Sequence, residues 1–470
     1  SFVHGETSTG VVSDAKTIAA IARETRDLQL VRFRGKVIDD YLKEIEITDL
    51  NKASIRQVLA TVKNAEKVTG QEFIHFEMGV PGIPPSAVGI RAQKEALDRG
   101  VASKYPDIEG IPELKEQASR FVKAFLNTDI SPKHCTPTCG AMQGTFASFL
   151  LCSQIDPKKD TILYIDPGFP VQKMQALVMG VKLCSFDVAD YRDDKLAPKL
   201  ESYLSQGNIC CIVYSNPNNP SWMCLTESEI RTIGELATKY DTIILEDLAY
   251  MTMDFRRDGL GIPFQPPYQV TVSHYTDNYI MMLSGSKIFS YAGERIAVAC
   301  ISDKLYERSY ETLRARYNIS RFGAVYAYDM LYAMSSGVTH SVQCAMAAML
   351  KAAVDGDYNF REDIREYARR TEFIKSALLK NGFHITYDKD LEEDVSNGFF
   401  FTFGYNLPDG TPMEGGQLLH ELLWFGISGI VLSSTGSSRQ GLRGCSSNIR
   451  DDQFPVLEER LRLFDEAHRL

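Results

Sequence analysis

The chain has 470 residues, a formal net charge of −10 and an isoelectric point near 5.5. At about 150 residues per domain this length predicts two to three domains, and hydrophobic and charged fractions of 44% and 24% are typical of globular proteins. The acidic balance argues against nucleic acid or an anionic membrane surface as the main partner.

The sequence offers no clear targeting, membrane or metal signal. It begins with the polar stretch SFVHGETSTG, without the basic and apolar regions of a signal peptide. No apolar run reaches the roughly 18 residues that a membrane span requires. The ten cysteines form no CxxC pair typical of a zinc site. We therefore expect reduced thiols, a cytoplasmic protein and no metal.

The first part of the chain is helical in pattern. Helical periodicity runs from about residue 14 to residue 70, and the stretch VPGIPPSA then interrupts it. Another amphipathic helix is predicted over IPELKEQASRFVKAFLN. After it, short apolar runs alternate with helices, as expected for a parallel sheet with crossover helices. The predicted strands are DTILYIDP, VKLCSFDV, NICCIVYSNP, DTIILEDL and NYIMMLSG.

Helices dominate again from about residue 305, with single helices predicted over KLYERSYETLRARYN, SVQCAMAAMLKAAV and REDIREYARRTEFIKSALLKNG. The segments from SNGFFFTFGY to GLRGCSSN predict a small mixed sheet. The fold class is therefore α/β, with a large domain over 75–340 and a smaller α+β domain over 341–470. The helical segment 1–74 is expected to join the smaller domain.

Several predicted strands end in polar side chains. Asn219 follows one strand, Asp247 and Tyr250 follow the next, and Ser284 and Lys287 follow a third. Ligands of open α/β sheets bind beyond the carboxyl ends of the strands. We therefore expect these side chains to face one ligand.

Two further features predict a place for an anion. Arg295 is predicted on an apolar strand eight residues after Lys287, where a cation requires a partner. Gly140, Ala141 and Met142 open a predicted helix, whose free N–H groups and dipole suit a phosphate.

Each of these residues alone has an ordinary structural explanation, such as a turn, a helix cap or a solvated loop charge. Together they predict pyridoxal 5′-phosphate (PLP), a phosphorylated aromatic aldehyde that can form an imine with Lys287. The phosphate would bind Arg295, Ser284 and the helix start. Asp247 would keep the ring nitrogen protonated, and Asn219 and Tyr250 would bind the phenolic oxygen.

The chain resembles the fold-type I aminotransferases of class I/II. The motifs that carry the resemblance are SGSKIFSYAGER, SNPNNPSW, EDLAY, KYPDIEGIPELKE and GLRGCSS. The resemblance implies the fold of the PLP-dependent transferases, with a mostly parallel sheet in the large domain. It also implies that Lys287 carries the internal aldimine and moves the proton between substrate Cα and cofactor C4′.

The resemblance suggests roles for four more positions. Phe169 is similar to the aromatic residue that stacks on the pyridine, although it could belong to the core. Tyr105 matches a tyrosine that reaches the phosphate of a neighbouring subunit, which implies a homodimer, but it could be a turn residue. Arg443 matches the arginine that binds the substrate α-carboxylate, or it could form a structural ion pair. Val80, with Asn219, is expected near the substrate.

Some positions depart from the family pattern. Trp222 stands where the family usually has glycine, and Ala297 replaces a glycine two residues after Arg295. The stretch RFGAVYAYDMLYAMSSG resembles an insertion near the mouth of the site. Arg321, within it, is a weak candidate for a second arginine that binds dicarboxylates. These departures leave the substrate undefined.

The resemblance implies ping-pong transamination between an amino acid and a 2-oxo acid. The same residues would serve a PLP-dependent lyase, acting by β-elimination or decarboxylation. A non-enzymatic ligand-sensing domain is a third interpretation, but residues 14–70 have mixed charge and no clear DNA-reading helix.

Overall fold

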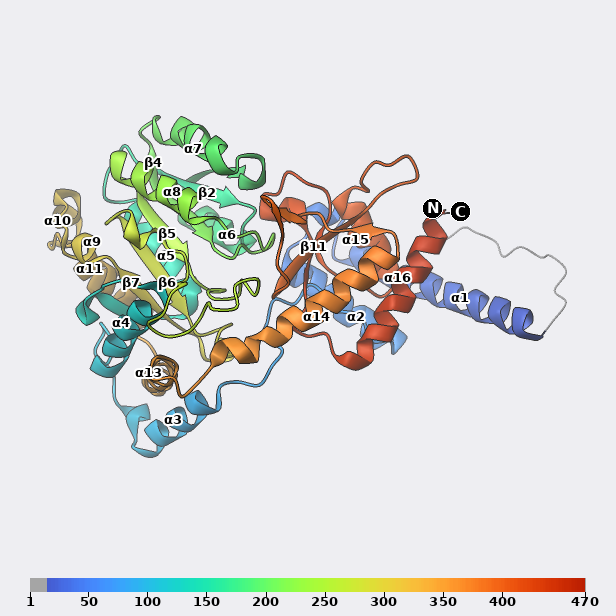
Figure 1. Cartoon of the computed structure of the whole chain (residues 1–470), viewed down its shortest axis with the longest axis horizontal. Coiled ribbons are helices and arrows are strands. Elements are labelled where there is room, and N and C mark those ends of the chain that lie inside the picture. Colours follow the sequence, from blue (N-terminus) through green and yellow to red (C-terminus); the bar gives the residue numbers. More distant parts are fainter. Residues whose placement is uncertain (1–14, 470) are drawn as a thin grey trace. The chain divides into compact units, whose positions relative to one another are not determined.

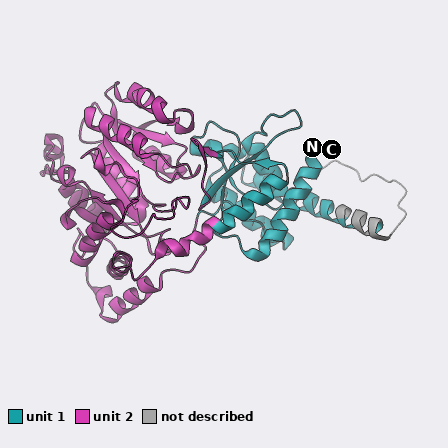
Figure 2. Ribbon diagram, viewed as in Figure 1, with its two compact units in different colours: residues 1–79, 369–388, 399–470 teal, residues 80–368, 389–398 magenta. Residues whose placement is uncertain are grey.

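The structure is a computed structural model that describes residues 15–469 (Figure 1). It contains two compact units (Figure 2). The larger unit comprises residues 80–368 and 389–398, and the smaller unit comprises the chain up to residue 79, residues 369–388 and those from 399 onward. These bounds differ from the predicted domain boundary at 340, because the helix that follows packs on two helices of the larger unit.

A seven-stranded sheet forms the centre of the larger unit, in the order β1-β7-β6-β5-β4-β2-β3. Only β7 runs antiparallel to its neighbours, and the five strands predicted from the apolar runs are all present. The strands are β1 (Cys135–Cys139), β2 (Thr161–Asp166), β3 (Lys182–Asp187), β4 (Ile209–Ser215), β5 (Ile243–Asp247), β6 (Tyr279–Ser284) and β7 (Ile296–Ile301).

Burial on both faces explains the apolar composition of the inner strands, whereas the edge strand β3 has two exposed residues. β6 and β7 are buried along their whole length. Alternate side chains, such as Ile280 and Met282 on β6, join one core cluster with the apolar face of the helix Gly140–Cys152. Side chains of a strand alternate between the two faces of its sheet, so the sheet separates two apolar layers.

Helices pack around this sheet (Figure 1). The segment predicted as one helix over 304–318 is instead two short helices, because the backbone of Arg308 and Tyr310 pairs with residues 320–322. The helices are α3 (Ala87–Asp98), α4 (Pro112–Leu126), α5 (Gly140–Cys152), α6 (Pro170–Met179), α7 (Leu196–Leu204), α8 (Glu227–Lys239), α9 (Asp303–Glu307), α10 (Glu311–Tyr317), α11 (Phe322–Val325), the π-helix Tyr326–Leu331, α12 (Tyr332–Ser335) and α13 (His340–Val354).

The smaller unit combines helices with a four-stranded sheet in the order β12-β13-β11-β8. The sequence predicted a mixed sheet, but the ladders between these strands are all antiparallel. About ten residues separate β12 from β13, too few for the crossover that a parallel pair needs. The elements are α1 (Ala15–Glu44), α2 (Ile55–Thr69), the later turns of α14 (Phe360–Lys380), α15 (Gly415–Trp424), α16 (Phe454–Arg469), β8 (Phe383–His384), β11 (Phe400–Tyr405), β12 (Ile430–Val431) and β13 (Leu442–Cys445).

Candidate active site

The parallel strands β4, β5 and β6 bring three predicted groups to one sheet edge. Ser215 at the end of β4 pairs with Asp247 at the end of β5, and Asp247 pairs with Met282 of β6. Asn219 and Lys287 follow β4 and β6 within a few residues. The polar strand exits predicted from the sequence therefore lie at the same edge.

Strand β7 runs antiparallel to β6, so the start of β7 lies at the edge where β6 ends. Arg295 is therefore placed at this edge. Ser284 pairs with Ala297, and Cys139 at the end of β1 pairs with Ile296. Arg295 was predicted on the strand itself, but it precedes β7, is exposed and has a left-handed φ of 56°. Because Arg295 stands just before the strand, its charge adjoins the apolar sequence of β7 without being buried in the sheet.

Gly140 and Arg295 form a narrow seat at the start of α5. Gly140 has φ 72°, and a Cβ built on it would lie 2.5 Å from Nη2 of Arg295. Only glycine lets the guanidinium approach the helix start this closely. Ala141 and Met142 follow in the first turn, so a cation and a helix N-terminus meet where an anion would be stabilised.

Asp247 is a partly buried carboxylate at the end of β5. Its Oδ1 accepts the N–H of Ala249 at 3.0 Å, and its Oδ2 accepts Nε2 of Gln172 at 3.3 Å. Desolvation raises the pKa of Asp247 above its ordinary value, although these bonds and the charge of Lys287 act to lower it. Sequence analysis missed Gln172, but it lies one helical turn after Phe169, and that spacing could have indicated it.

Asn219 and Tyr250 are both buried at this edge. The backbone N–H of Asn219 donates to Oγ of Ser215 at 3.0 Å. The side-chain Oδ1 of Asn219 is buried and has no hydrogen-bond partner among the described residues. Buried polar atoms are nearly always paired, so this atom indicates a place for a ligand.

Trp222, which stands where the family usually has glycine, packs against Tyr250. Its ring contacts Tyr250 edge-on at a centroid distance of 5.5 Å and occupies the space where Gly398 lacks a side chain. Trp222 is fully buried with φ 65°, a rare conformation for a bulky residue. Such strain is frequent beside functional sites.

Phe169 and Tyr105 differ in their exposure to solvent. Phe169 follows β2 as the N-cap residue of α6 and is half-buried. Tyr105 is 87% exposed.

Arg443 lies on β13 of the smaller unit and is buried. Its Nη2 donates to the carbonyl oxygen of Glu77 at 2.9 Å, and its guanidinium lies 4.6 Å from the ring centroid of Phe400. Gly79 is adjacent, since a Cβ there would lie 3.6 Å from Nη2 of Arg443. Val80, in the larger unit, is exposed.

Arg321 lies at the opposite edge of the large sheet. Ile301 at the end of β7 pairs with Ile280 near the start of β6, and α9 follows from there. Arg321 forms an ion pair of 3.2 Å with Glu307 of α9. These contacts argue against the weak expectation that it binds a dicarboxylate beside Lys287.

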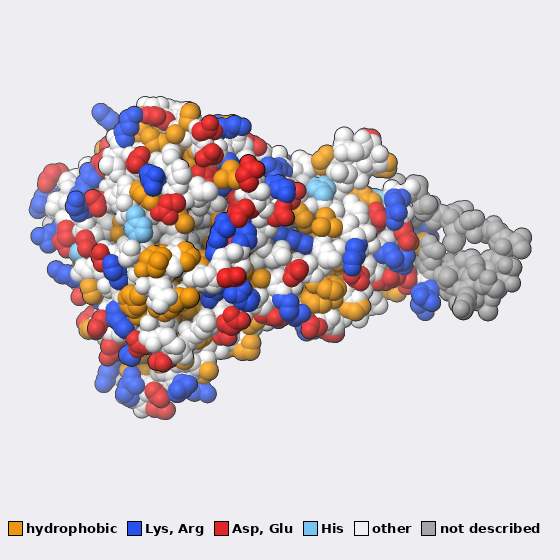
Figure 3. Space-filling model, viewed as in Figure 1, with side chains coloured by type: hydrophobic (Ala, Val, Ile, Leu, Met, Phe, Trp, Pro, Cys, Tyr) orange, Lys and Arg blue, Asp and Glu red, His pale blue; other side chains and the backbone are white. Residues whose placement is uncertain are grey.

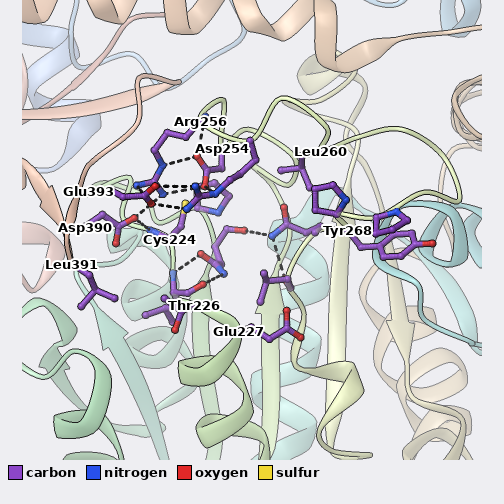
Figure 4. Close-up of a pocket in the computed structure, with 18 of the residues that line it drawn as sticks. Cys224, Thr226, Glu227, Asp254, Arg256, Leu260, Tyr268, Asp390, Leu391 and Glu393 are labelled. Atoms are coloured by element: carbon purple, nitrogen blue, oxygen red, sulfur yellow. Dashed lines mark hydrogen bonds and ion pairs between the residues drawn. The ribbon is translucent and has the colours of Figure 1, made fainter.

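A cavity of about 710 Å³ in the larger unit is lined by residues that include Cys224, Arg256, Tyr268 and Asp390 (Figure 4). Gln269 in its wall donates to the carbonyl of Asn216 at 3.1 Å and accepts the N–H of Thr252 at 2.8 Å. Arg256, another wall residue, is paired with Asp254 and Asp390. Asn219, Asp247, Tyr250 and Lys287 are not among the residues that line this cavity.

The residues at the sheet edge fit PLP. The Gly140–Arg295 seat suits a phosphate, and the unpaired oxygen of Asn219 indicates a polar ligand group. Asp247 would gain from a cationic partner such as a protonated ring nitrogen.

Comparison with known proteins identifies the family. The model of the family "Aminotransferase class I and II" matches residues 72–390. The chain belongs to this family. Its members depend on PLP, in agreement with the donor set at the sheet edge.

This aminotransferase is similar to several curated relatives. It is 23% identical over 381 residues to the probable aspartate aminotransferase of Methanocaldococcus jannaschii, which covers 81% of this chain and 90% of that protein. It is 24% identical over 338 residues to the glutamate-pyruvate aminotransferase AlaC of Escherichia coli, with coverage of 71% and 74%.

Solved structures show the same fold. The aspartate aminotransferase of Thermus thermophilus with maleate matches with a TM-score of 0.69 and 16% identity, covering 88% of this chain and 96% of that one. The alanine aminotransferase of Pyrococcus furiosus matches with a TM-score of 0.70 and 18% identity, with the same coverage. Within residues 15–469 of this aminotransferase, we find no helix that combines the length and the hydropathy of a membrane span.

Proposed function

We propose that this aminotransferase moves the α-amino group between an amino acid and a 2-oxo acid in two half-reactions at the Lys287 edge of the large sheet. The observation that carries the proposal is the Gly140–Arg295 seat beside the strand exits that bear Asp247 and Lys287. Bound PLP would supply a carbonyl carbon for the substrate amine and an electron-withdrawing ring.

Lys287 is the proposed acid–base residue. Its ε-amine would hold the cofactor between turnovers and, once displaced by substrate, take the proton from substrate Cα. The amine must be neutral to accept that proton. Asp247 would stabilise the protonated ring nitrogen, which strengthens electron withdrawal during the proton transfer.

The other predicted residues would bind and orient. Those proposed for the cofactor hold its phosphate, its phenolic oxygen or its ring face, and those proposed for the substrate bind its carboxylate or line its position. The residues proposed for the phosphate are Gly140, Ala141, Met142, Ser284 and Arg295. Asn219 and Tyr250 are proposed for the phenolic oxygen, and Phe169 for the ring. The residues proposed for the substrate are Arg443, Asn219 and Val80.

We also propose a homodimer with shared sites, in which Tyr105 reaches the phosphate of the neighbouring subunit. The exposure of Tyr105 supports this role, because a side chain that serves another subunit must project from its own. The ten cysteines are free thiols, which supports the proposed cytoplasmic location, a reducing compartment.

Replacing Lys287 tests the chemistry. We expect Lys287→Ala to lower amino-group transfer by at least about 10²–10⁴-fold, the usual contribution of a positioned acid–base group. Aspartate, alanine and glutamate are the first donors to test, since the relatives' names refer to such compounds. Transfer is measured as amino-acid and oxo-acid products by chromatography.

Lys304→Ala is the control, because Lys304 is exposed on α9 at the opposite sheet edge. Undiminished transfer in Lys287→Ala would contradict the proposal. So would release of ammonia and pyruvate by the wild-type protein without a matching amino-acid product, since that is the result of β-elimination.

A further inference from the structure

A histidine in the smaller unit is held between two carboxylates. Nδ1 of His75 lies 2.7 Å from Oε1 of Glu77, and its Nε2 lies 2.9 Å from Oε2 of Glu66 on α2. Glu77 is fully buried, and its second oxygen accepts a hydrogen bond from the hydroxyl of Ser428. The carboxylate of Glu77 is therefore bound on both oxygens.

His75 and Glu77 belong to an extended segment that is hydrogen-bonded to other segments of the smaller unit. The N–H of Ile74 donates to the carbonyl of Gly426 at 2.9 Å, and the N–H of Cys445 donates to the carbonyl of Phe76 at 2.9 Å. Because extended side chains alternate, His75 and Glu77 share one face and Phe76 takes the other. The segment thus has a fixed register against β13.

The same segment binds Arg443. Glu77 accepts Nη2 of Arg443 on its backbone oxygen at 2.9 Å, and Gly79 lies beside the same nitrogen. Glu77 consequently contacts Arg443 through its backbone and His75 through its side chain. A shift of the Glu77 side chain would move the carbonyl that orients the guanidinium.

Protonated His75 can donate a hydrogen bond to each of the two carboxylates, Glu66 and Glu77. A neutral imidazole has one N–H donor, whereas the imidazolium has two and can bond both carboxylates. Burial acts to lower the pKa of His75, but Glu77 and Glu66 outweigh it and raise the pKa to about 9. Arg460, whose Nη1 donates to the carbonyl of Gly426, is the further charge near Glu66.

We propose that His75, clamped between Glu66 and Glu77, is a positioning residue that fixes the guanidinium of Arg443 for the substrate carboxylate. This inference rests on the proposed function, in which Arg443 binds that carboxylate. It predicts that His75 affects recognition of the carboxylate and not of the amine.

The experiment compares two ligands of the cofactor-loaded enzyme that differ by one carboxylate. 2-Methylalanine has no Cα hydrogen and cannot be transaminated, and isopropylamine is the same molecule without the carboxylate. Isopropylamine keeps a hydrogen on the carbon that bears the amine, so binding of each ligand is measured from the change in cofactor absorbance immediately after mixing, before isopropylamine is converted. We expect His75→Gln to weaken binding of 2-methylalanine about tenfold, the effect of one lost hydrogen bond to a charged group, and to leave isopropylamine unchanged.

His134→Gln is the matched control. His134 also lies between two carboxylates, with Nδ1 2.5 Å from Asp303 and Nε2 2.9 Å from Glu307, but near α9 in the larger unit. Its replacement should leave the binding of both ligands unchanged. Equal weakening of both ligands by His75→Gln, or unchanged binding of 2-methylalanine, would overturn the inference.

The pH dependence gives a second readout. His75 bonds both carboxylates below its raised pKa, so binding of 2-methylalanine relative to isopropylamine should weaken as the pH rises through about 9. This relative change should persist in His134→Gln and be absent in His75→Gln. A relative change that persists in His75→Gln would overturn the inference.

Two more variants keep the test decisive. If His75→Gln does not fold, Ser428→Ala takes its place, because it removes the other donor to the Glu77 carboxylate. This variant should weaken the binding of 2-methylalanine and not that of isopropylamine. The absence of this selective effect would overturn the inference. Arg443→Lys tests the role of Arg443 itself. Unchanged binding of 2-methylalanine in Arg443→Lys would refute that role, whereas the assignment of Lys287 is tested separately by transfer activity.

Discussion

Gly140 shows how one residue without a side chain can define a binding position. Its left-handed φ disfavours a Cβ, and the guanidinium of Arg295 leaves no space for one. The sequence predicted an anion at this helix start from residue types alone. The close approach of Arg295 could not be predicted, because it depends on the pairing of β1 with β7.

Replacing this glycine should selectively damage cofactor binding. In Gly140→Ala the new methyl group would lie 2.5 Å from Nη2 of Arg295, so the guanidinium must move away from the helix start. We expect the affinity for PLP to fall at least about tenfold, since a hydrogen bond to a charged group is weakened or lost. The affinity is measured by titrating the cofactor-free protein with PLP and following absorbance.

Gly356→Ala separates this effect from backbone strain. Gly356 has φ 81° with open space around the built Cβ, so alanine there carries a similar conformational cost of about 1 kcal/mol without a clash. Its affinity for PLP should remain that of the wild type. Equal losses in the two variants would contradict the proposed phosphate seat.

At the scale of elements, the hairpin of β9 (Lys389–Asp390) and β10 (Glu393–Asp394) is joined to the larger unit by buried charges. Asp390 binds Arg192 at 2.7 Å. It also binds Arg256 at 2.9 Å and accepts the N–H of Cys224 at 2.9 Å (Figure 4). One carboxylate thus bridges two guanidinium groups, whose remaining charge is balanced by Glu229 and Asp254. This explains why a short hairpin distant in sequence belongs to the larger unit.

Neutralising Asp390 should therefore destabilise the protein. Asp390→Asn removes one buried carboxylate from Arg192, which keeps Glu229, and from Arg256, which keeps Asp254 and Glu393. We therefore expect a loss of about 3 kcal/mol in the free energy of unfolding, at the low end for broken buried pairs. Urea denaturation followed by circular dichroism measures the change. Glu393→Gln loses the half-exposed pair with Arg257 and a longer pair of 3.4 Å with Arg256, and it should cost less than about 1 kcal/mol. Similar costs for the two variants would argue against the buried network.

Elements also show where sequence patterns fail. The apolar runs predicted the buried strands correctly, because burial on both faces requires apolar side chains throughout. The pattern over 304–318 predicted one helix, but pairing of residues 308–310 with residues 320–322 divides it. Long-range backbone pairing of this kind overrides local propensity.

At the scale of the whole molecule, acidic and basic side chains are interspersed over the face shown in Figure 3. The acidic net charge of −10 therefore does not make this face uniformly acidic. Exposure of Tyr105 is the feature that bears on assembly. It supports the proposal that each site receives a residue from a second copy of the chain.

Complementation between two inactive variants tests shared sites. Tyr105→Ala and Lys287→Ala should each have low activity as pure proteins. After they are mixed, unfolded and refolded together, half of the dimers should be mixed and one of two sites in each should be intact, so about a quarter of wild-type transfer should return. Activity no higher than the mean of the pure variants would contradict shared sites.

The sequence by itself determined the fold class, the succession of buried strands along the chain and the family motifs around Lys287. These features are local, because apolar runs and short motifs follow from the chemistry of neighbouring residues. Only the tertiary structure decided that Gly140 meets Arg295, that Gln172 binds Asp247 and that His75 joins Glu66 to the segment beside Arg443. Each of these contacts joins residues from separate elements, and strand register and helix packing bring them together.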